Sequence, residues 1–216
     1  MRNIAAIMGR RQRQGLLLAG LGWLAGWDVL AAGAAPATDE VRIVEVQGIV
    51  EVLPAGSVDW VRTQAGQELR PFAHVRTGTN SRAALRWTDQ SVVPLNALTE
   101  IEILPAHAPG AGAGLHLFKG ILSFFHRGQP GRIRVLTGGA VAGIEGTEFV
   151  IEVAMVDQRE RTTVAVIDGR VSLSNEVDSI VVTNLESAYA EPGRAPTRTA
   201  GFVVNNVLQW AFYYPA

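Results

Sequence analysis

The sequence contains no cysteine and only one lysine, Lys119. The absence of cysteine excludes disulfide bonds, a thiol nucleophile, zinc held by cysteine and a lipid-modified cysteine. Charged residues are also scarce, at 18% of the chain, whereas hydrophobic residues reach 48%. That balance is sufficient for one ordinary domain with a substantial core.

A long hydrophobic run is missing too. The apolar run at residues 15–27 is shorter than the about 20 residues that span a bilayer. It follows four arginines and precedes small residues with Ala-x-Ala spacing, which predicts a signal peptide over residues 1–37 and a periplasmic location. An uncleaved anchor is the alternative, and the Arg10-Arg11 pair leaves both the general and the twin-arginine export routes open.

Removal of residues 1–37 takes away four arginines and one aspartate, which changes the formal net charge from −1 to −4. The remaining chain has no basic run. This mild acidity argues against a nucleic-acid partner. We expect no stable membrane span after the signal peptide is cleaved.

The rest of the chain alternates between apolar and polar residues. In residues 41–53, Val44, Val46, Val50 and Val52 share one phase, which predicts a half-buried strand with a bulge or a close approach at Gly48. The dipeptide Asp168-Gly169 between two alternating runs predicts a hairpin. Short strands with regular turn signals predict an all-β fold, a single β-sandwich or roll-like domain of short antiparallel strands.

Near the C-terminus the period changes to helical spacing, at Val204, Leu208, Ala211 and Phe212. We therefore expect three regions: a signal peptide (1–37), a β domain (38–185), and a C-terminal strand or loop with a short aromatic helix (186–216).

No set of residues forms a convincing catalytic or metal-binding pattern. The histidines fall in separate predicted strands and a loop, and the serines lack a G-x-S-x-G elbow. The acidic pairs Glu100/Glu102 and Glu148/Glu152 are expected to be solvated on strand faces. The sequence therefore predicts a protein that is not an enzyme and has no cofactor and no metal. Four strand aromatics are assigned to the core: Trp60, Trp87, Phe124 and Phe149.

The most specific pattern lies in residues 132–175. It reads RIRVLTGGAVAGIEGTEFVIEV, then a charged turn, then TTVAVIDGRVSL. Together with HVRTG, SRAAL and TDQS upstream, this series resembles the FecR domain, a periplasmic bacterial module, over roughly residues 41–185. The resemblance implies a structural role for its signature residues: Gly48, Thr77, Gly78, Asp89, Gly146, Thr147, Phe149 and Gly169.

Three positions depart from the family pattern, since Gln90, Gly138 and Glu145 stand where relatives have glycine, proline and arginine. Founding members of the family are single-span regulators of iron(III) citrate transport with a cytoplasmic segment that binds a sigma factor. We expect this chain to lack such a segment. The resemblance implies a non-catalytic binding or scaffolding module in periplasmic signalling or sensing, with a protein partner in the periplasm. A cell-wall or carbohydrate-binding β module is the alternative.

The C-terminal sequence VLQWAFYYP resembles a segment of exported proteins that joins a FecR-like domain to tetratricopeptide repeats. Its position at the end of the chain predicts a truncated repeat protein or one that has lost its repeats. Trp210, Phe212, Tyr213 and Tyr214 are candidate docking residues. They are expected either to fold back on the β domain or to mediate self-association.

Overall fold

The structure is a computed structural model that describes residues 40–105, 113–126 and 131–200. Every regular element within these ranges is a β-strand, which confirms the all-β prediction. The predicted signal peptide and C-terminal helix lie outside the described residues. The described part of the chain contains no helix that could cross a membrane. The strands are β1 (Val41–Gln47), β2 (Val50–Leu53), β3 (Val61–Arg62), β4 (Glu68–Leu69), β5 (His74–Thr77), β6 (Arg82–Trp87), β7 (Val92–Leu95), β8 (Glu100–Leu104), β9 (Ala113–Phe125), β10 (Gly131–Leu136), β11 (Val141–Val156), β12 (Arg159–Ser174), β13 (Ser179–Thr183), β14 (Glu186–Glu191) and β15 (Arg194–Arg198).

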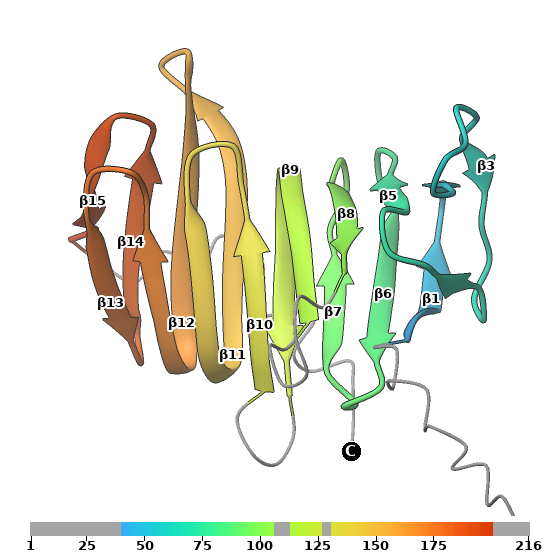
Figure 1. The fold of residues 1–216 in the computed structure, drawn as a ribbon, viewed down its shortest axis with the longest axis horizontal. Helices are drawn as coiled ribbons and strands as arrows, with labels where there is room; N and C mark the ends of the chain where they lie inside the picture. Colours follow the sequence, from blue (N-terminus) through green and yellow to red (C-terminus); the bar gives the residue numbers. More distant parts are fainter. Residues whose placement is uncertain (1–39, 106–112, 127–130, 201–216) are drawn as a thin grey trace, which may run out of the picture. The chain divides into compact units, whose positions relative to one another are not determined.

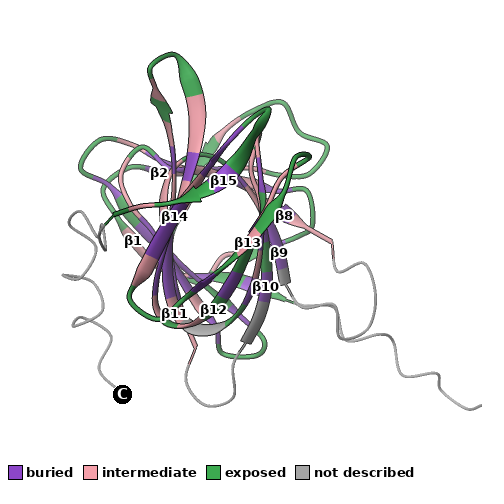
Figure 2. Cartoon of the chain, turned by 90° about the vertical axis from the view of Figure 1, so that its left-hand side faces the viewer, coloured by how far each residue is buried: buried purple, intermediate pink, exposed green. Residues whose placement is uncertain are grey.

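All fifteen strands belong to one sheet, and the strand pairing folds this sheet into two layers. The three long strands β9, β11 and β12 pass through both layers, because each changes its pairing partner halfway along. The first half of β9 pairs with β8 and β10, whereas its second half pairs with β7 and β11. Similarly, one half of β12 pairs with β14 and the other half with β13. Figure 1 shows the strands side by side, and Figure 2 shows them around a buried interior.

We call the two sides of the fold the first and second layers. The first layer contains β3, β2, β5, β8, residues 113–119 of β9, β10, residues 141–146 of β11, residues 170–174 of β12, and β13. The second layer contains β4, β1, β6, β7, residues 120–125 of β9, residues 148–156 of β11, residues 159–166 of β12, β14 and β15.

The chain crosses between the layers along two edges, which we call seams. At the first seam it crosses at Gly48, at residues 78–81, at residues 96–99 and at Gly120. At the second seam it crosses between β9 and β10, at residues 146–148, at residues 168–169 and at residues 184–185. Gly48, Gly120 and Gly169 have φ values of 76°, 94° and 113°, a region that side chains with a Cβ disfavour. Glycine at these points lets a strand turn the corner.

Two predicted local structures are wrong. Residues 41–53 form two strands in different layers, because Gly48 breaks the strand. A register shift between Ile43 and Glu45 also changes the phase, so Ile43 is buried and Val44 is only half-buried. The Asp168-Gly169 hairpin does not form either, since β12 continues through Gly169 and pairs with β11 on both sides of it. The turn between β11 and β12 lies at Asp157-Gln158.

The core between the layers consists of alternate residues from both. Valine, leucine and isoleucine dominate it, with the rings of Phe124 and Phe149 stacked at a centroid distance of 5.0 Å. Trp87 also belongs to this core, as predicted, but Trp60 does not. Strands β14 and β15, within the region expected to hold a strand or loop, extend the second layer to Arg198.

Candidate interaction surface

Signature residues Thr77 and Gly78 lie at the first seam, where buried side chains replace the sheet ladder. The Thr77 hydroxyl accepts a hydrogen bond from the Thr99 amide at 2.9 Å, and the Thr77 amide donates to the Thr99 carbonyl. The Thr99 hydroxyl in turn accepts from the Ile121 amide at 3.0 Å. A Cβ at Gly120 would lie only 2.5 Å from the Thr99 Cα. These residues therefore hold consecutive chain crossings together.

Gly48 belongs to the same seam. The Ile49 amide donates to the Ser81 hydroxyl at 2.8 Å, and the Gly78 amide donates to the Ile49 carbonyl. A Cβ at Gly48 would meet the Ser81 Oγ at 2.5 Å. The space that a side chain would need is occupied by the hydroxyl that satisfies the neighbouring amide.

Asp89 lies at the second seam, next to Ser91 and His126. Its carboxylate accepts hydrogen bonds from both the amide and the hydroxyl of Ser91, each at 2.8 Å. The Ser91 hydroxyl also lies 2.8 Å from Nδ1 of His126. In a hydrolytic triad the histidine stands between the serine and the acid. Here the serine stands between the other two and is buried, so the arrangement ties a turn to the end of β9 and does not present a nucleophile.

The other signature glycines face one another at this seam, since Gly146 pairs with both Gly131 and Gly169. Thr147 is the next residue along the chain, and the register of β11 shifts around Glu148. Burial raises the pKa of the Glu148 carboxyl above its ordinary value, and the nearby charge of Asp168 adds to this effect. Phe149, the last signature residue, is fully buried. The signature residues thus lie at the corners of the strands or in the core.

An exposed aromatic cluster lies elsewhere, on the outer face of the first layer. His74 stacks on Phe118 at a centroid distance of 5.4 Å, and the His116 ring lies 4.1 Å from Phe118 at a tilt of 36°. Trp60 meets His74 edge-on, and the Arg76 guanidinium lies 4.1 Å above the Trp60 ring. Phe118 is 36% exposed. We call these five residues the aromatic patch.

A groove lies farther along the same outer face, across β10, β11 and β12. Its volume is about 380 Å³, and its polar lining comes from Arg134, Glu145, Arg170 and Ser172. Gly143 forms the floor, because the space where its Cβ would stand is empty. The groove therefore combines two guanidinium groups, those of Arg134 and Arg170, with one carboxylate, that of Glu145. The β9–β10 pairing places Gly114 beside Arg134, which joins the groove to the strand that carries Phe118.

The sequence did not reveal this surface. Trp60 was expected in the core, and the histidines were expected to fall in separate strands and a loop. His74 and His116 instead lie on either side of Glu102 in paired strands, and Nδ1 of His74 is buried without a hydrogen-bond partner in the described structure. The pairing of β5, β8 and β9 creates the patch, and no spacing along the chain encodes that pairing.

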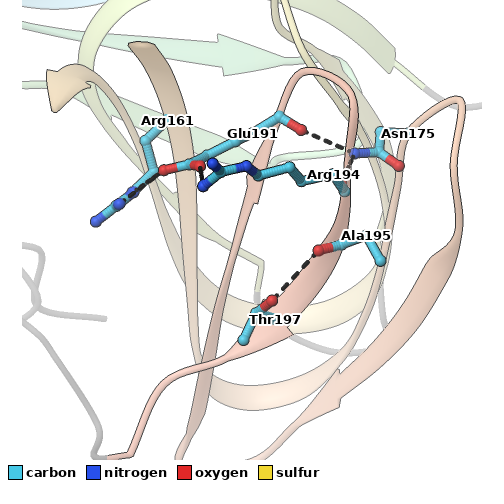
Figure 3. Close-up of polar contacts among 6 residues, drawn as sticks. All are labelled: Arg161, Asn175, Glu191, Arg194, Ala195 and Thr197. Carbon is cyan, nitrogen blue, oxygen red and sulfur yellow. Dashed lines mark hydrogen bonds and ion pairs between the residues drawn. The ribbon is translucent and has the colours of Figure 1, made fainter. Parts of the chain in front are cut away.

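A buried charge cluster connects β12, β14 and β15 (Figure 3). The Glu191 carboxylate, in a residue that is 4% exposed, accepts hydrogen bonds from Arg161 at 2.6 and 2.9 Å and from Arg194 at 3.2 Å. The bonds from Arg161 hold the pKa of Glu191 below its usual range. The Asn175 amide donates to the Glu191 carbonyl at 3.1 Å. The buried Glu191 carboxylate is thus compensated by two guanidinium groups, and the Arg194 side chain remains 62% exposed, which suits a structural role.

Among the described residues, no group of three or more acidic or histidine side chains is arranged to hold a metal ion. The candidate docking residues Trp210, Phe212, Tyr213 and Tyr214 lie outside the described part of the chain. The aromatic patch and the adjoining groove are therefore the exposed features whose chemistry suits binding.

Residues 73–172 match the family model described as "FecR protein". This part of the chain is a FecR domain. This finding confirms the family suggested by the motif series, and the match includes the first-seam threonines, Asp89 and the Gly146–Phe149 core of the signature.

Two crystal structures, each described as a "putative anti-sigma factor" from Parabacteroides distasonis ATCC 8503, have a similar fold. Each superposes with a TM-score of 0.51 at 17% sequence identity over 64% of this chain. The chain spans just under two thirds of their length, 64% and 63%. No curated protein shows significant sequence similarity to the chain. At this identity the likeness to these two crystal structures concerns the fold alone.

Proposed function

We propose that this protein is an exported, non-catalytic FecR-domain module that binds a protein partner in periplasmic signalling or sensing. The aromatic patch is the observation that supports this function best. Tryptophan and arginine are enriched at the centres of protein interfaces, and here they lie together on a sheet face next to exposed Phe118. The fold shared with proteins described as anti-sigma factors is consistent with a signalling role.

The chemistry of the surface suggests the character of the partner. Phe118 offers an apolar contact, while Arg134 and Arg170 lie at the groove. Gly114 is four residues from Phe118 along β9 and adjoins Arg134, which corresponds to about 13 Å along the strand. The partner surface should therefore combine an apolar side chain with carboxylates at roughly that separation. A protein surface can supply both.

A carbohydrate ligand suits the patch less well, although it is the leading alternative. Sugar binding requires an open ring face on which the sugar can stack. One face of Trp60 is covered by Arg76, and Phe118 stacks on His74 while His116 lies close by. The rings are already engaged with one another, which leaves edges and a small exposed area instead of a flat platform.

Site-specific photocross-linking in the producing bacterium tests this proposal. A benzophenone amino acid replaces Phe118, and the same amino acid at Met155, which is 68% exposed in the second layer, serves as the control. We expect one discrete protein adduct from position 118 that is absent from position 155 and is lost in the double variant Arg134→Glu, Arg170→Glu. Identical adducts from both positions, or an adduct found only in the glycan fraction, would contradict the proposal.

The periplasmic location has its own test, which is independent of the partner. Cleavage is expected between Ala34 and Thr38, as predicted from the Ala-x-Ala spacing. N-terminal sequencing of the protein from a periplasmic fraction should find this new end. Recovery of protein that still begins at Met1 in the membrane pellet would favour an uncleaved anchor instead.

A further inference from the structure

A row of small residues crosses the outer face of the second layer. Its members occupy neighbouring positions on six strands, β6, β7, β9, β11, β12 and β14, and they alternate with residues that point into the core. The small-residue row consists of Ala84, Pro94, Ser123, Val150, Ala165 and Ser187.

These residues are buried although they point away from the core. Ala84 is 0% exposed, Ala165 is 3% exposed and Val150 is 6% exposed, yet none of the three belongs to the core cluster between the layers. Small side chains on an open sheet face would remain in contact with water. The row is therefore a trough that is covered from outside.

Ser123 shows the same burial. The residue is 1% exposed although it belongs to the outward-facing row. Buried hydroxyl groups are almost always hydrogen-bonded. A segment that covers the row is therefore expected to offer Ser123 a polar group, such as an indole N–H.

The chain leaves the described structure at one end of this trough. After β15, both the amide and the hydroxyl of Thr199 donate to the Ser187 carbonyl, at 2.9 and 3.1 Å. Six strands cover about 24 Å from the first to the last, at about 4.8 Å per step. Residues 201–216 would cover about 24 Å as a helix. The C-terminal segment thus begins beside the row and has the length to cross it.

Other segments are poorly placed to cover the row. Residues 127–130 join β9 to β10 and are too few to cross six strands and return. Residues 106–112 connect two strands of the first layer, on the other side of the fold. Most of the N-terminal segment is the predicted signal peptide, which is absent from the exported protein.

We propose that residues 201–216 lie along the small-residue row of the second layer, with Trp210 and Phe212 filling the trough. Small residues leave room for large rings, and the burial of aromatic surface against the sheet is favourable at about 25 cal/mol per Å². The second-layer face is then occupied by the protein's own C-terminus, while the first-layer face remains open to a partner. This inference does not depend on the proposed function.

The lack of natural cysteine permits a direct test by thiol accessibility. Ser123→Cys places one thiol in the row of the full chain, and Ser172→Cys places one on the exposed face of the first layer as the matched control. We expect truncation after Ala200 to raise the maleimide labelling rate at position 123 at least tenfold and to leave position 172 unchanged. Trp210→Ala with Phe212→Ala in the full chain should raise the same rate, which covers the case in which the truncated chain fails to fold.

Unchanged labelling at position 123 in the full-chain aromatic variant would overturn the proposal. Protection that is lost on dilution, together with a dimer in light scattering, would also overturn it, because the segment would then come from a second copy. Equal increases in the labelling rate at positions 123 and 172 would indicate general loosening of the domain. They would contradict specific binding of the C-terminal segment along the small-residue row.

Discussion

At the residue scale, Thr77 shows why a signature residue need not be a binding residue. Its hydroxyl satisfies the buried amide of Thr99 at a point where the sheet ladder is interrupted. Valine has nearly the same shape but cannot accept this hydrogen bond. The requirement for threonine therefore comes from the backbone of a neighbouring chain crossing.

Thr77→Val is expected to lower the free energy of unfolding by about 1–3 kcal/mol, because the Thr99 amide loses its partner while it remains buried. Thr197→Val is the control, since that hydroxyl bonds an exposed carbonyl and its loss should change stability by less than about 0.5 kcal/mol. Urea melts of both variants measure the difference. Equal midpoints would mean that the Thr77 hydroxyl contributes nothing to the seam.

Glu148 predicts a pH dependence. Burial first, and then the charge of Asp168, raises its folded-state pKa, so the folded protein binds this proton more tightly than the unfolded chain does. The associated stabilisation is complete below the ordinary pKa of a glutamate and is lost as the pH rises through the folded-state value. Glu148→Gln should therefore stabilise the protein at about pH 7 and have little effect at about pH 4. Urea midpoints at the two pH values measure this, with Glu152→Gln as the control. A larger stabilisation by Glu148→Gln at the acidic pH would contradict the prediction.

At the element scale, the long strands pass from one layer to the other at sharp bends. Gly120 has the same φ as Gly66, 94°, but the surroundings of the two glycines differ. A Cβ at Gly120 would lie 2.5 Å from Thr99, whereas nothing lies within 4 Å of the position of a Cβ at Gly66. Substitution of Gly66 therefore tests backbone strain alone, whereas substitution of Gly120 tests backbone strain together with steric conflict.

Gly66→Ala should cost on the order of 1–3 kcal/mol from backbone strain alone. Gly120→Ala should cost clearly more, since the Thr99 backbone would have to move and the hydrogen bonds at the first seam would be disturbed. Thermal or urea unfolding of the two variants gives the comparison. Equal losses of unfolding free energy in the two variants would show that the first seam accommodates the added Cβ without a steric penalty.

One departure from the family pattern has a neighbour in space. Gly138 stands where the family pattern has proline, and a Cβ there would lie 2.5 Å from a carboxylate oxygen at the movable end of the Glu160 side chain. The turn that contains Gly138 follows β10, whereas Glu160 belongs to β12. Two distant sequence positions are therefore linked by a close approach in space.

At the scale of the whole molecule, β9, β11 and β12 make the two layers one cooperative unit, because each strand belongs to both. Phe149→Ala should cost about 3–5 kcal/mol, since it removes a fully buried ring that stacks on Phe124. The loss should appear as one shifted transition in both tryptophan fluorescence and far-ultraviolet circular dichroism. Two separate transitions would mean that the layers unfold independently.

The sequence by itself determined the all-β class and the FecR domain. Alternating residues report which side of a strand is buried. The order of short motifs can also be recognised in the sequence when the strand pairing is unknown. The close approach predicted at Gly48 is confirmed, since a Cβ there would meet the Ser81 Oγ at 2.5 Å. The single strand predicted over residues 41–53 and the hairpin predicted at Gly169 are wrong, because local patterns do not show where a chain passes from one layer to the other when the partner strands are unknown.

Only the tertiary structure decided which residues form surfaces. His74, His116 and Phe118 meet because β8 lies between β5 and β9, and the groove at Arg134 exists because Gly143 leaves its floor empty. Likewise, the small-residue row is assembled from six strands that span residues 82 to 191. Residues that are distant along the chain become neighbours through strand order, and a linear sequence contains no local signal for strand order.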